Sequence, residues 1–140
     1  MLVSLDIKSA FDAAWWFNIL KSLQEFGCPR NLYYLTKNYL SQRTAILSTN
    51  TIKLERQITK GCPQGFCCRP GLWNIQYNSL LNLKFAKQTS AIAFADDLIL
   101  VTRGKTVIEA ESFTNTELNK ITTWAKTIRL NSMTRNQLPY

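Results

Sequence analysis

The sequence predicts an α+β fold in which helices cover a small, mostly antiparallel sheet. Three observations favour it: segments with apolar residues at helical spacing alternate with short β-branched runs, two of these runs are divided by turn residues, and no internal repeat, low-complexity segment or linker interrupts the pattern. The predicted order is strand, two helices, hairpin, helix, hairpin, helix. A length of 140 residues suits one domain and is enough to bury most of its apolar surface.

The first half of the chain begins with a short buried strand over residues 2–7, read as LVSLDI. Residues 13–27 have apolar residues at helical spacing and end at Gly27, a residue type favoured at helix C-termini. A second helix is predicted over residues 29–43, where Pro29 suits a helix N-terminus. The apolar face that we expect for this second helix consists of Leu32, Leu35, Tyr39 and Leu40.

The second half of the chain contains two predicted hairpins and two predicted helices. The first hairpin lies within residues 44–61 and turns near the sequence STNT. The second lies within residues 91–101 and turns at residues 95–97. Between them, residues 61–71 read as a loop with three glycines and two prolines. The helices are predicted over residues 72–87 and 106–128, the latter with its apolar spacing at Val107, Ala110, Phe113, Leu118, Ile121 and Trp124.

The chain is basic, with a formal net charge of +8. Between Phe26 and Ala95 the acid Glu55 is outnumbered by nine basic residues, and aromatic residues are interleaved with them. Such a face suits a polyanion such as nucleic acid, although a solvated basic surface over core aromatics fits the same pattern. The basic residues are Arg30, Lys37, Arg43, Lys53, Arg56, Lys60, Arg69, Lys84 and Lys87.

Composition excludes several classes of protein. Nearly half of the residues are apolar, which disfavours disorder, and no apolar run approaches the ~20 residues of a membrane span, so no membrane partner is expected. The chain starts inside a predicted strand without a signal-peptide pattern, so we expect a fragment of a longer protein. No histidine is present and the four cysteines form no C-x-x-C pair, which disfavours zinc and favours free thiols in a reducing compartment.

Two adjacent carboxylates, Asp96 and Asp97, interrupt the apolar run AIAFADDLILV. Like charges about 4 Å apart repel by roughly 4 kcal/mol at a surface-like dielectric, and burying either one costs more. If the first strand lies beside this hairpin, Asp6 at its end reaches the same edge of the sheet. Three carboxylates form an oxygen-only site that suits Mg²⁺ or Mn²⁺. The alternative is a pair of solvated turn aspartates and an ordinary strand end.

Three motifs in order carry a resemblance to a known family. They are SLDIKSAFDAAWW from residue 4, GCPQGFCCRPGLWN from residue 61 and AFADDLILV from residue 93. They resemble successive palm motifs of reverse transcriptases of non-LTR (LINE-like) retrotransposons, and the resemblance extends from Leu2 to about Asn131. It implies a polymerase palm-like fold with a ferredoxin-like or RRM-like core. Residues 1–140 would be one fragment of a reverse transcriptase domain, with the fingers largely absent and the thumb absent.

The resemblance also implies a reaction and its metal site. Asp6, Asp96 and Asp97 would be the catalytic, metal-binding acids, and the carbonyl of Ile7 would complete the shell of Mg²⁺ or Mn²⁺. The implied reaction is RNA-directed DNA synthesis, in which a DNA primer 3′-hydroxyl on an RNA template attacks a dNTP and pyrophosphate leaves. Fingers, thumb and an endonuclease region would belong to the rest of a longer polyprotein.

A nucleotide site follows from the same resemblance. The backbone around Ser9 and Ala10 would approach the triphosphate, and Phe11 would be the steric gate that excludes a 2′-hydroxyl. Gln64, with Gly65 beside it, would face the incoming nucleotide and the template. Position alone also allows Phe11 to be a core residue at a helix start and Gln64 to be a solvated loop residue.

The sequence departs from the family at three positions. Phe66 stands where serine is usual, Arg69 where glycine is usual, and Thr134 where a lysine is expected. If the backbone at residue 69 requires a positive φ, arginine there is strained. These departures leave open a catalytically inactive remnant that at most binds nucleic acid. An RNA-templated RNA polymerase palm is disfavoured by Phe11 and by the form FADD.

Overall fold

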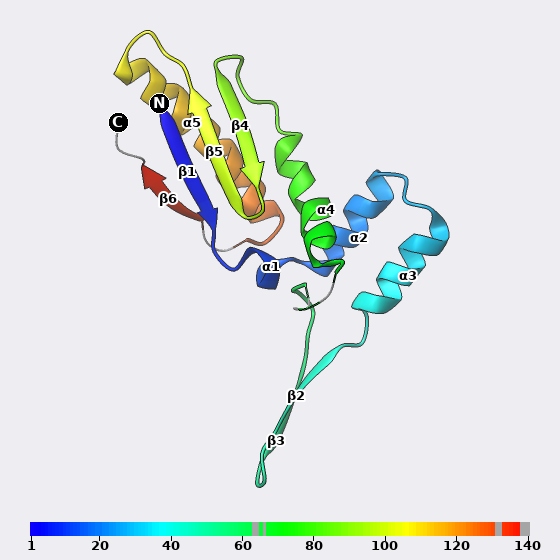
Figure 1. Cartoon of the computed structure of the whole chain (residues 1–140). Coiled ribbons are helices and arrows are strands. Elements are labelled where there is room, and N and C mark those ends of the chain that lie inside the picture. Colours follow the sequence, from blue (N-terminus) through cyan, green and yellow to red (C-terminus); the bar gives the residue numbers. More distant parts are fainter. Residues whose placement is uncertain (63–64, 66, 131–132, 138–140) are drawn as a thin grey trace. The chain divides into compact units, whose positions relative to one another are not determined.

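The computed structural model describes the whole chain except residues 63–64, 66, 131–132 and 138–140 (Figure 1). The described residues form two compact units. One comprises residues 1–10 and 77–140, and the other comprises residues 11–76. The division falls inside two helices: between Ala10 and Phe11 in α1 (Ala10–Ala13), and between Gln76 and Tyr77 in α4 (Arg69–Leu81).

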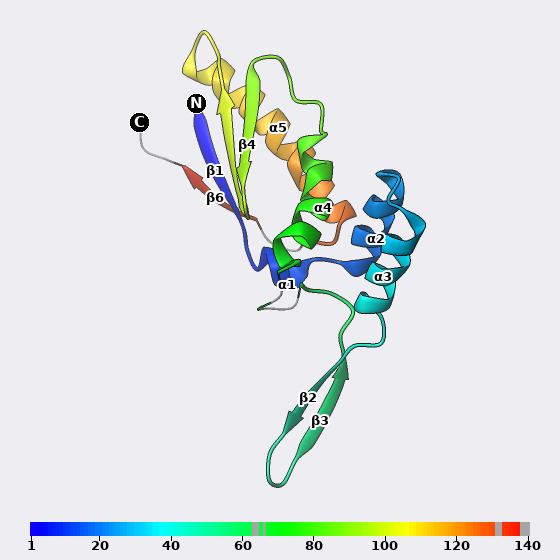
Figure 2. The same ribbon diagram turned by 45° about the vertical axis from the view of Figure 1, so that its right-hand side comes forward.

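The first unit is built on a four-stranded antiparallel sheet, in agreement with the predicted fold class. Its strand order is β4-β5-β1-β6, so the N-terminal strand lies inside the sheet with a partner on each side. Figures 1 and 2 show the helix α5 (Val107–Thr127) lying along one face of this sheet. The strands are β1 (Leu2–Ile7), β4 (Thr89–Phe94), β5 (Asp97–Thr102) and β6 (Met133–Gln137).

The two faces of this sheet differ in burial. Val3, Leu5 and Ile7 alternate along β1 and are buried, as are Leu98 and Leu100 on β5. Successive side chains of a strand point to opposite faces, so these residues form the core side. The intervening residues of β1 and β5, which include both strand aspartates, lie on the other face and are at least partly exposed. The sheet therefore has one packed face and one open face.

Helix α5 has a polar cap at its start and polar groups on its buried side. The Thr106 hydroxyl accepts a hydrogen bond from the backbone N–H of Glu109, and the Glu109 carboxylate accepts one from the N–H of Lys105. This reciprocal arrangement satisfies donors that a helix start leaves open. Buried positions include Ala110, Ile121 and Trp124, as expected, but Val107 is 68% exposed and the polar residues Thr114 and Glu117 are buried instead.

The second unit contains two whole helices, all of α1 but its first residue, a hairpin and the first residues of α4. The helix expected from residue 13 is divided: α1 ends at Ala13, and α2 starts at Trp16 because the backbone of Trp15 makes a β-bridge to Lys60. Gly27 follows α2 with a φ of +66°, which suits its expected place after the helix. The helices are α1 (Ala10–Ala13), α2 (Trp16–Glu25) and α3 (Arg30–Leu40).

The hairpin of the second unit is β2 (Thr44–Ser48) paired with β3 (Lys53–Gln57), as the sequence predicts. All ten of its strand residues are exposed, and in Figures 1 and 2 it extends away from α2 and α3. The expected apolar face of α3 is only partly buried, because Leu40 is buried whereas Leu32 and Leu35 are 49% and 67% exposed. This unit therefore leaves a large apolar surface uncovered.

Candidate catalytic centre

The two strands that carry the predicted acids are direct neighbours. Asp6 on β1 lies opposite Asp97 on β5, and the backbone N–H of Ile7 donates to the carbonyl of Asp96 over 3.3 Å. Residues directly opposite each other in an antiparallel pair have Cβ atoms about 4.5–5.5 Å apart and share a face. The fold thus brings Asp6 and Asp97 together at one end of the open face, with Asp96 in the turn beside them.

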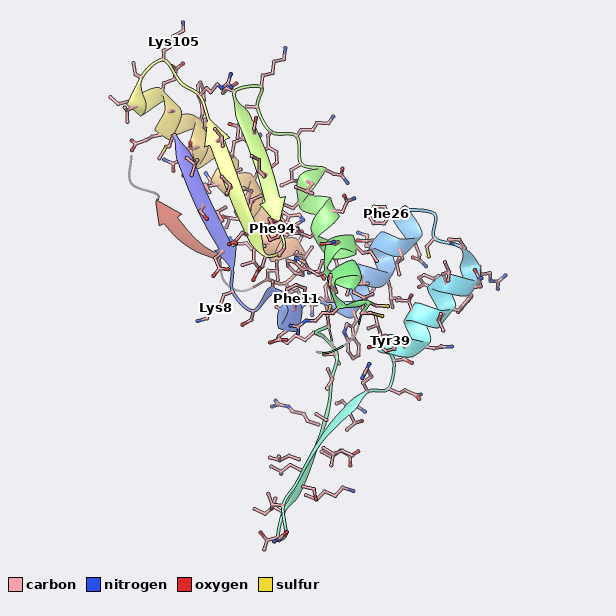
Figure 3. The ribbon with its side chains drawn as sticks, viewed as in Figure 1. Lys8, Phe11, Phe26, Tyr39, Phe94 and Lys105 are labelled. Atoms are coloured by element: carbon pink, nitrogen blue, oxygen red, sulfur yellow. The ribbon has the colours of Figure 1, made fainter. Side chains whose placement is uncertain are left out.

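The acids are not buried, although the run around them is apolar. Asp6 and Asp96 are half-buried and Asp97 is exposed. On β4, which pairs with β5, Ile92 and Phe94 are 58% and 82% exposed; Figure 3 labels Phe94 at the end of its strand. Water therefore reaches the carboxylates, and the burial cost expected from the apolar sequence does not arise.

A tight turn holds the acidic pair at the end of the hairpin. Only Ala95 and Asp96 connect β4 to β5, and Ala95 has a φ of +52°. Two-residue hairpin turns require positive φ, which glycine and asparagine adopt more readily than alanine. The backbone at Ala95 is therefore strained.

A buried tyrosine supports this turn from the core. The Tyr77 hydroxyl donates a hydrogen bond to the backbone carbonyl of Asp97 over 3.4 Å, and its ring lies 6.1 Å from that of Trp124. Burial raises the pKa of Tyr77 well above its ordinary value, and the charges of Asp97 and Asp96 raise it further. The phenol stays protonated and remains a donor at neutral pH. The sequence did not predict this role. Tyr77 is one of the aromatic residues interleaved with the basic residues between Phe26 and Ala95, and nothing else in the sequence marks it.

The described residues contain no group of three or more carboxylate, thiol or imidazole side chains that could hold a metal ion as they stand. The sheet register aligns Asp6 with Asp97, and Asp96 lies in the adjoining turn. The three side chains do not form a group close enough to hold one ion. The convergence of all three side chains on one ion therefore stays a prediction. Thr134, where the family carries lysine, lies opposite Asp6 on the other side of β1.

The predicted nucleotide-site residues fall in both units. Ser9 is exposed with a φ of +55°, and Ala10 is buried. Phe11 belongs to the second unit, is half-buried, and packs its ring 5.8 Å from the ring of the buried Trp73. Gly65 is exposed with a φ of +75°, whereas Gln64 and Phe66 lie outside the described residues.

Arg69 contacts Phe11, the predicted steric gate. Its guanidinium lies 4.6 Å from the centre of the Phe11 ring, and its Nη2 lies 3.6 Å from Oδ1 of Asp12. Arg69 is the first residue of α4 and is not among the residues with positive φ, so the strain expected for arginine at this position is absent. Arg69 and Trp73 are four residues apart on α4 and therefore share the helix face that contacts Phe11.

The loop before α4 is tied to the segment that carries Phe11. The N–H of Cys62 donates to the carbonyl of Phe11, and the N–H of Gly61 to that of Ala14, each over 2.7 Å. A Cβ on Gly61 would lie 3.2 Å from the carbonyl oxygen of Asp12, so this close approach favours glycine.

Burial raises the pKa of the Cys62 thiol to about 11, although the charge of Arg69 opposes the shift. All four cysteines are free, as expected.

Comparisons with known proteins agree with this fold. A solved structure of apo telomerase from Candida tropicalis, truncated from its C-terminal domain, superimposes with a TM-score of 0.67 over 96% of this chain and 30% of that chain, at 13% sequence identity. The likeness places the fold in the polymerase palm-like class. The chain also matches the model of the family described as reverse transcriptase (RNA-dependent DNA polymerase) over residues 1–133, and it belongs to that family.

Curated relatives place the chain among LINE-like elements, which confirms the resemblance to non-LTR retrotransposons. It is 30% identical over 120 residues to the putative 115 kDa protein in type-1 retrotransposable element R1DM of Drosophila melanogaster, covering 86% of this chain and 12% of that protein. It is 28% identical over 136 residues to the RNA-directed DNA polymerase from mobile element jockey of the same species, covering 91% of this chain and 15% of that protein. The chain thus spans a small part of the length of these relatives.

Among the described residues, no helix is long and apolar enough to cross a membrane.

Proposed function

We propose that residues 1–140 are one fragment of the palm of an RNA-directed DNA polymerase from a non-LTR retrotransposon. The enzyme transfers a nucleotide from a dNTP to a DNA primer 3′-hydroxyl on an RNA template. The observation that carries the proposal is the alignment of Asp6 with Asp97 at the end of the open sheet face, in a chain of the reverse transcriptase family. Fingers, thumb and endonuclease regions come from the rest of a longer polyprotein.

The donor set fits a hard divalent cation. Asp6, Asp96 and Asp97 offer only oxygen ligands at a solvent-accessible edge, which suits Mg²⁺ or Mn²⁺. These three side chains and the carbonyl of Ile7 would hold it. When bound, the metal favours deprotonation of the primer hydroxyl and neutralises charge on the leaving pyrophosphate.

The protein's own contribution is positioning. The β1–β5 register and the hydrogen bond from Tyr77 fix where the acidic turn stands. The backbone at Ser9 and Ala10 binds the triphosphate, and Gln64 with Gly65 orients the nucleotide against the template. The Phe11 ring excludes a sugar with a 2′-hydroxyl. Its contact with the buried Trp73 supports this role, because a steric gate must hold its ring in one place.

Metal binding by the purified chain tests this proposal without requiring polymerase activity. Mn²⁺ titrations followed by electron paramagnetic resonance should show binding that falls at least about tenfold in Asp97→Asn and in Asp6→Asn, since each change removes an anionic ligand. Glu111→Gln is the matched control, because it removes an exposed acid from α5 of the same unit. Equal binding by the wild type, the site variants and the control would overturn the proposal.

A catalytically inactive remnant is the second candidate, and one observation favours it. The Arg69 guanidinium covers a face of Phe11, where the family has glycine at residue 69. A longer enzyme that contains this palm separates the two candidates by primer extension on one RNA template. If Phe66→Ser with Arg69→Gly raises the rate at least about tenfold, the chain as written is impaired. Equal rates would remove the support for an inactive remnant.

A further inference from the structure

A basic pocket lies in the second unit, at the base of the β2–β3 hairpin and away from the acidic turn in sequence. Its volume is about 320 Å³, within the range of small-molecule sites. The hairpin is closed at this end by a hydrogen bond of 2.8 Å from the N–H of Ile58 to the carbonyl of Arg43. The pocket is lined by Asp12, Trp16, Arg43, Ile58, Lys60 and Gly61, together with Cys62.

Two cations dominate the charge of this pocket. Asp12 is its acid and is paired with Arg69, whereas no carboxylate of the described residues lies within ion-pair distance of Arg43 or Lys60. The Arg43 guanidinium stacks 4.9 Å from the centre of the Tyr39 ring, near the end of α3 (Figure 3). Stacking orients the plane of a guanidinium and leaves its edge available for an anion such as phosphate.

Positive charge continues from the pocket along the hairpin. Arg56 is the fourth of the five residues of β3 and Lys53 is the first, near the tip, while Glu55 is the one acid between residues 44 and 60. All of these strand residues are exposed. A mononucleotide would occupy the pocket alone, whereas a polymer with repeating phosphates would use the pocket and the hairpin together.

We propose that the pocket binds a backbone phosphate of single-stranded RNA between Arg43 and Lys60, and that the hairpin carries the adjoining nucleotides. The choice of RNA rests on the proposed function, whereas the phosphate site rests on Arg43 and Lys60, which have no carboxylate partner among the described residues. The hairpin then has a role in holding the template that is separate from the acidic turn.

Binding of a fluorescent oligouridine of about 12 nucleotides to the purified chain tests this, with affinity measured over a range of salt concentrations. We expect Arg43→Gln with Lys60→Gln to weaken binding roughly tenfold at low salt. The slope of log affinity against log salt should become shallower by about 0.7, since the variant loses one phosphate contact and each single-strand phosphate contact contributes about 0.7.

The matched control is Arg30→Gln with Lys37→Gln. It removes the same charges from α3 in the same unit, and Arg30 also stacks on a tyrosine, Tyr34, at 5.5 Å. The control should keep most of the wild-type affinity. Circular dichroism confirms that each variant is folded before it is compared.

Three results would overturn the inference: no binding by the wild type, equal losses in the pocket and control variants, or binding of UTP as tight as that of the oligomer. The last would assign the pocket to a mononucleotide. Adding Asp97→Asn keeps this test distinct from the catalytic proposal, because that change should leave RNA affinity unaltered while it lowers Mn²⁺ binding.

Discussion

At the scale of single residues, Arg69 shows how a departure from a family pattern can be accommodated. Its side chain is 23% exposed and contacts both Phe11 and Asp12. A partly desolvated cation–π contact contributes about 0.5–2 kcal/mol and a surface ion pair up to about 1 kcal/mol. The contacts of Arg69 stabilise the second unit, whatever they do to catalysis.

Replacing Arg69 with glycine should therefore destabilise the chain by about 1–2 kcal/mol, because both contacts are lost. The measurement is urea unfolding followed by tryptophan fluorescence. Arg30→Gly is the control, since Arg30 also starts a helix and stacks on an aromatic ring but is exposed. A loss for Arg69→Gly no larger than for the control would show that the contacts contribute little.

The raised pKa of the Cys62 thiol makes the stability of the fold depend on pH. Its pKa in the folded chain is raised to about 11, whereas an unfolded thiol titrates near 9. A raised pKa favours the protonated native state, so the contribution is complete below pH 9 and is lost as the pH rises through 11. The free energy of unfolding should thus fall more steeply between pH 9 and 11 in the wild type than in Cys62→Ala. Parallel curves for the two proteins would contradict this.

At the scale of elements, the β4–β5 turn has a backbone that alanine does not favour. With a φ of +52° at Ala95, Ala95→Gly should raise the free energy of unfolding by about 0.5–1 kcal/mol, since glycine adopts this conformation without strain. Ala93→Gly, within β4, is the control and should lower it by roughly 0.5–1 kcal/mol. Urea unfolding measures both. Destabilisation by Ala95→Gly would mean that the turn conformation carries no strain.

Elements whose signals are local could be predicted from the sequence. The β4–β5 hairpin, the β2–β3 hairpin and α5 lie close to their predicted places, because periodicity and turn residues are encoded within each segment. The alignment of Asp6 with Asp97 followed from assuming that their strands are neighbours.

Elements that depend on distant partners could not be predicted. The strand β6 has a polar sequence without alternation and forms because β1, far away in the chain, pairs with it. Trp15 interrupts the expected helix because its backbone bridges to Lys60. The role of Tyr77 depends on the core position of its hydroxyl beneath Asp97, and no sequence spacing records that position.

At the scale of the whole molecule, the chain alone is expected to have little or no polymerase activity. Phosphoryl transfer depends on holding the primer and triphosphate in line, and much of the rate comes from such positioning. The chain spans 12% and 15% of two relatives, so most of a comparable protein is outside it. The measurement is Mg²⁺-dependent primer extension by the purified 140 residues. Robust extension that Asp96→Asn abolishes would contradict this expectation.

The inner position of β1 also has a consequence for biosynthesis. Its partners are β5, which ends at Thr102, and β6, which begins at Met133. At about 5–20 residues per second, a ribosome needs roughly 5–20 seconds after making β1 to complete β5. During this interval the apolar residues Val3, Leu5 and Ile7 have no strand to pair with. The nascent chain is then exposed to aggregation, and the acidic turn cannot reach Asp6 until about 90 further residues have been synthesised after it.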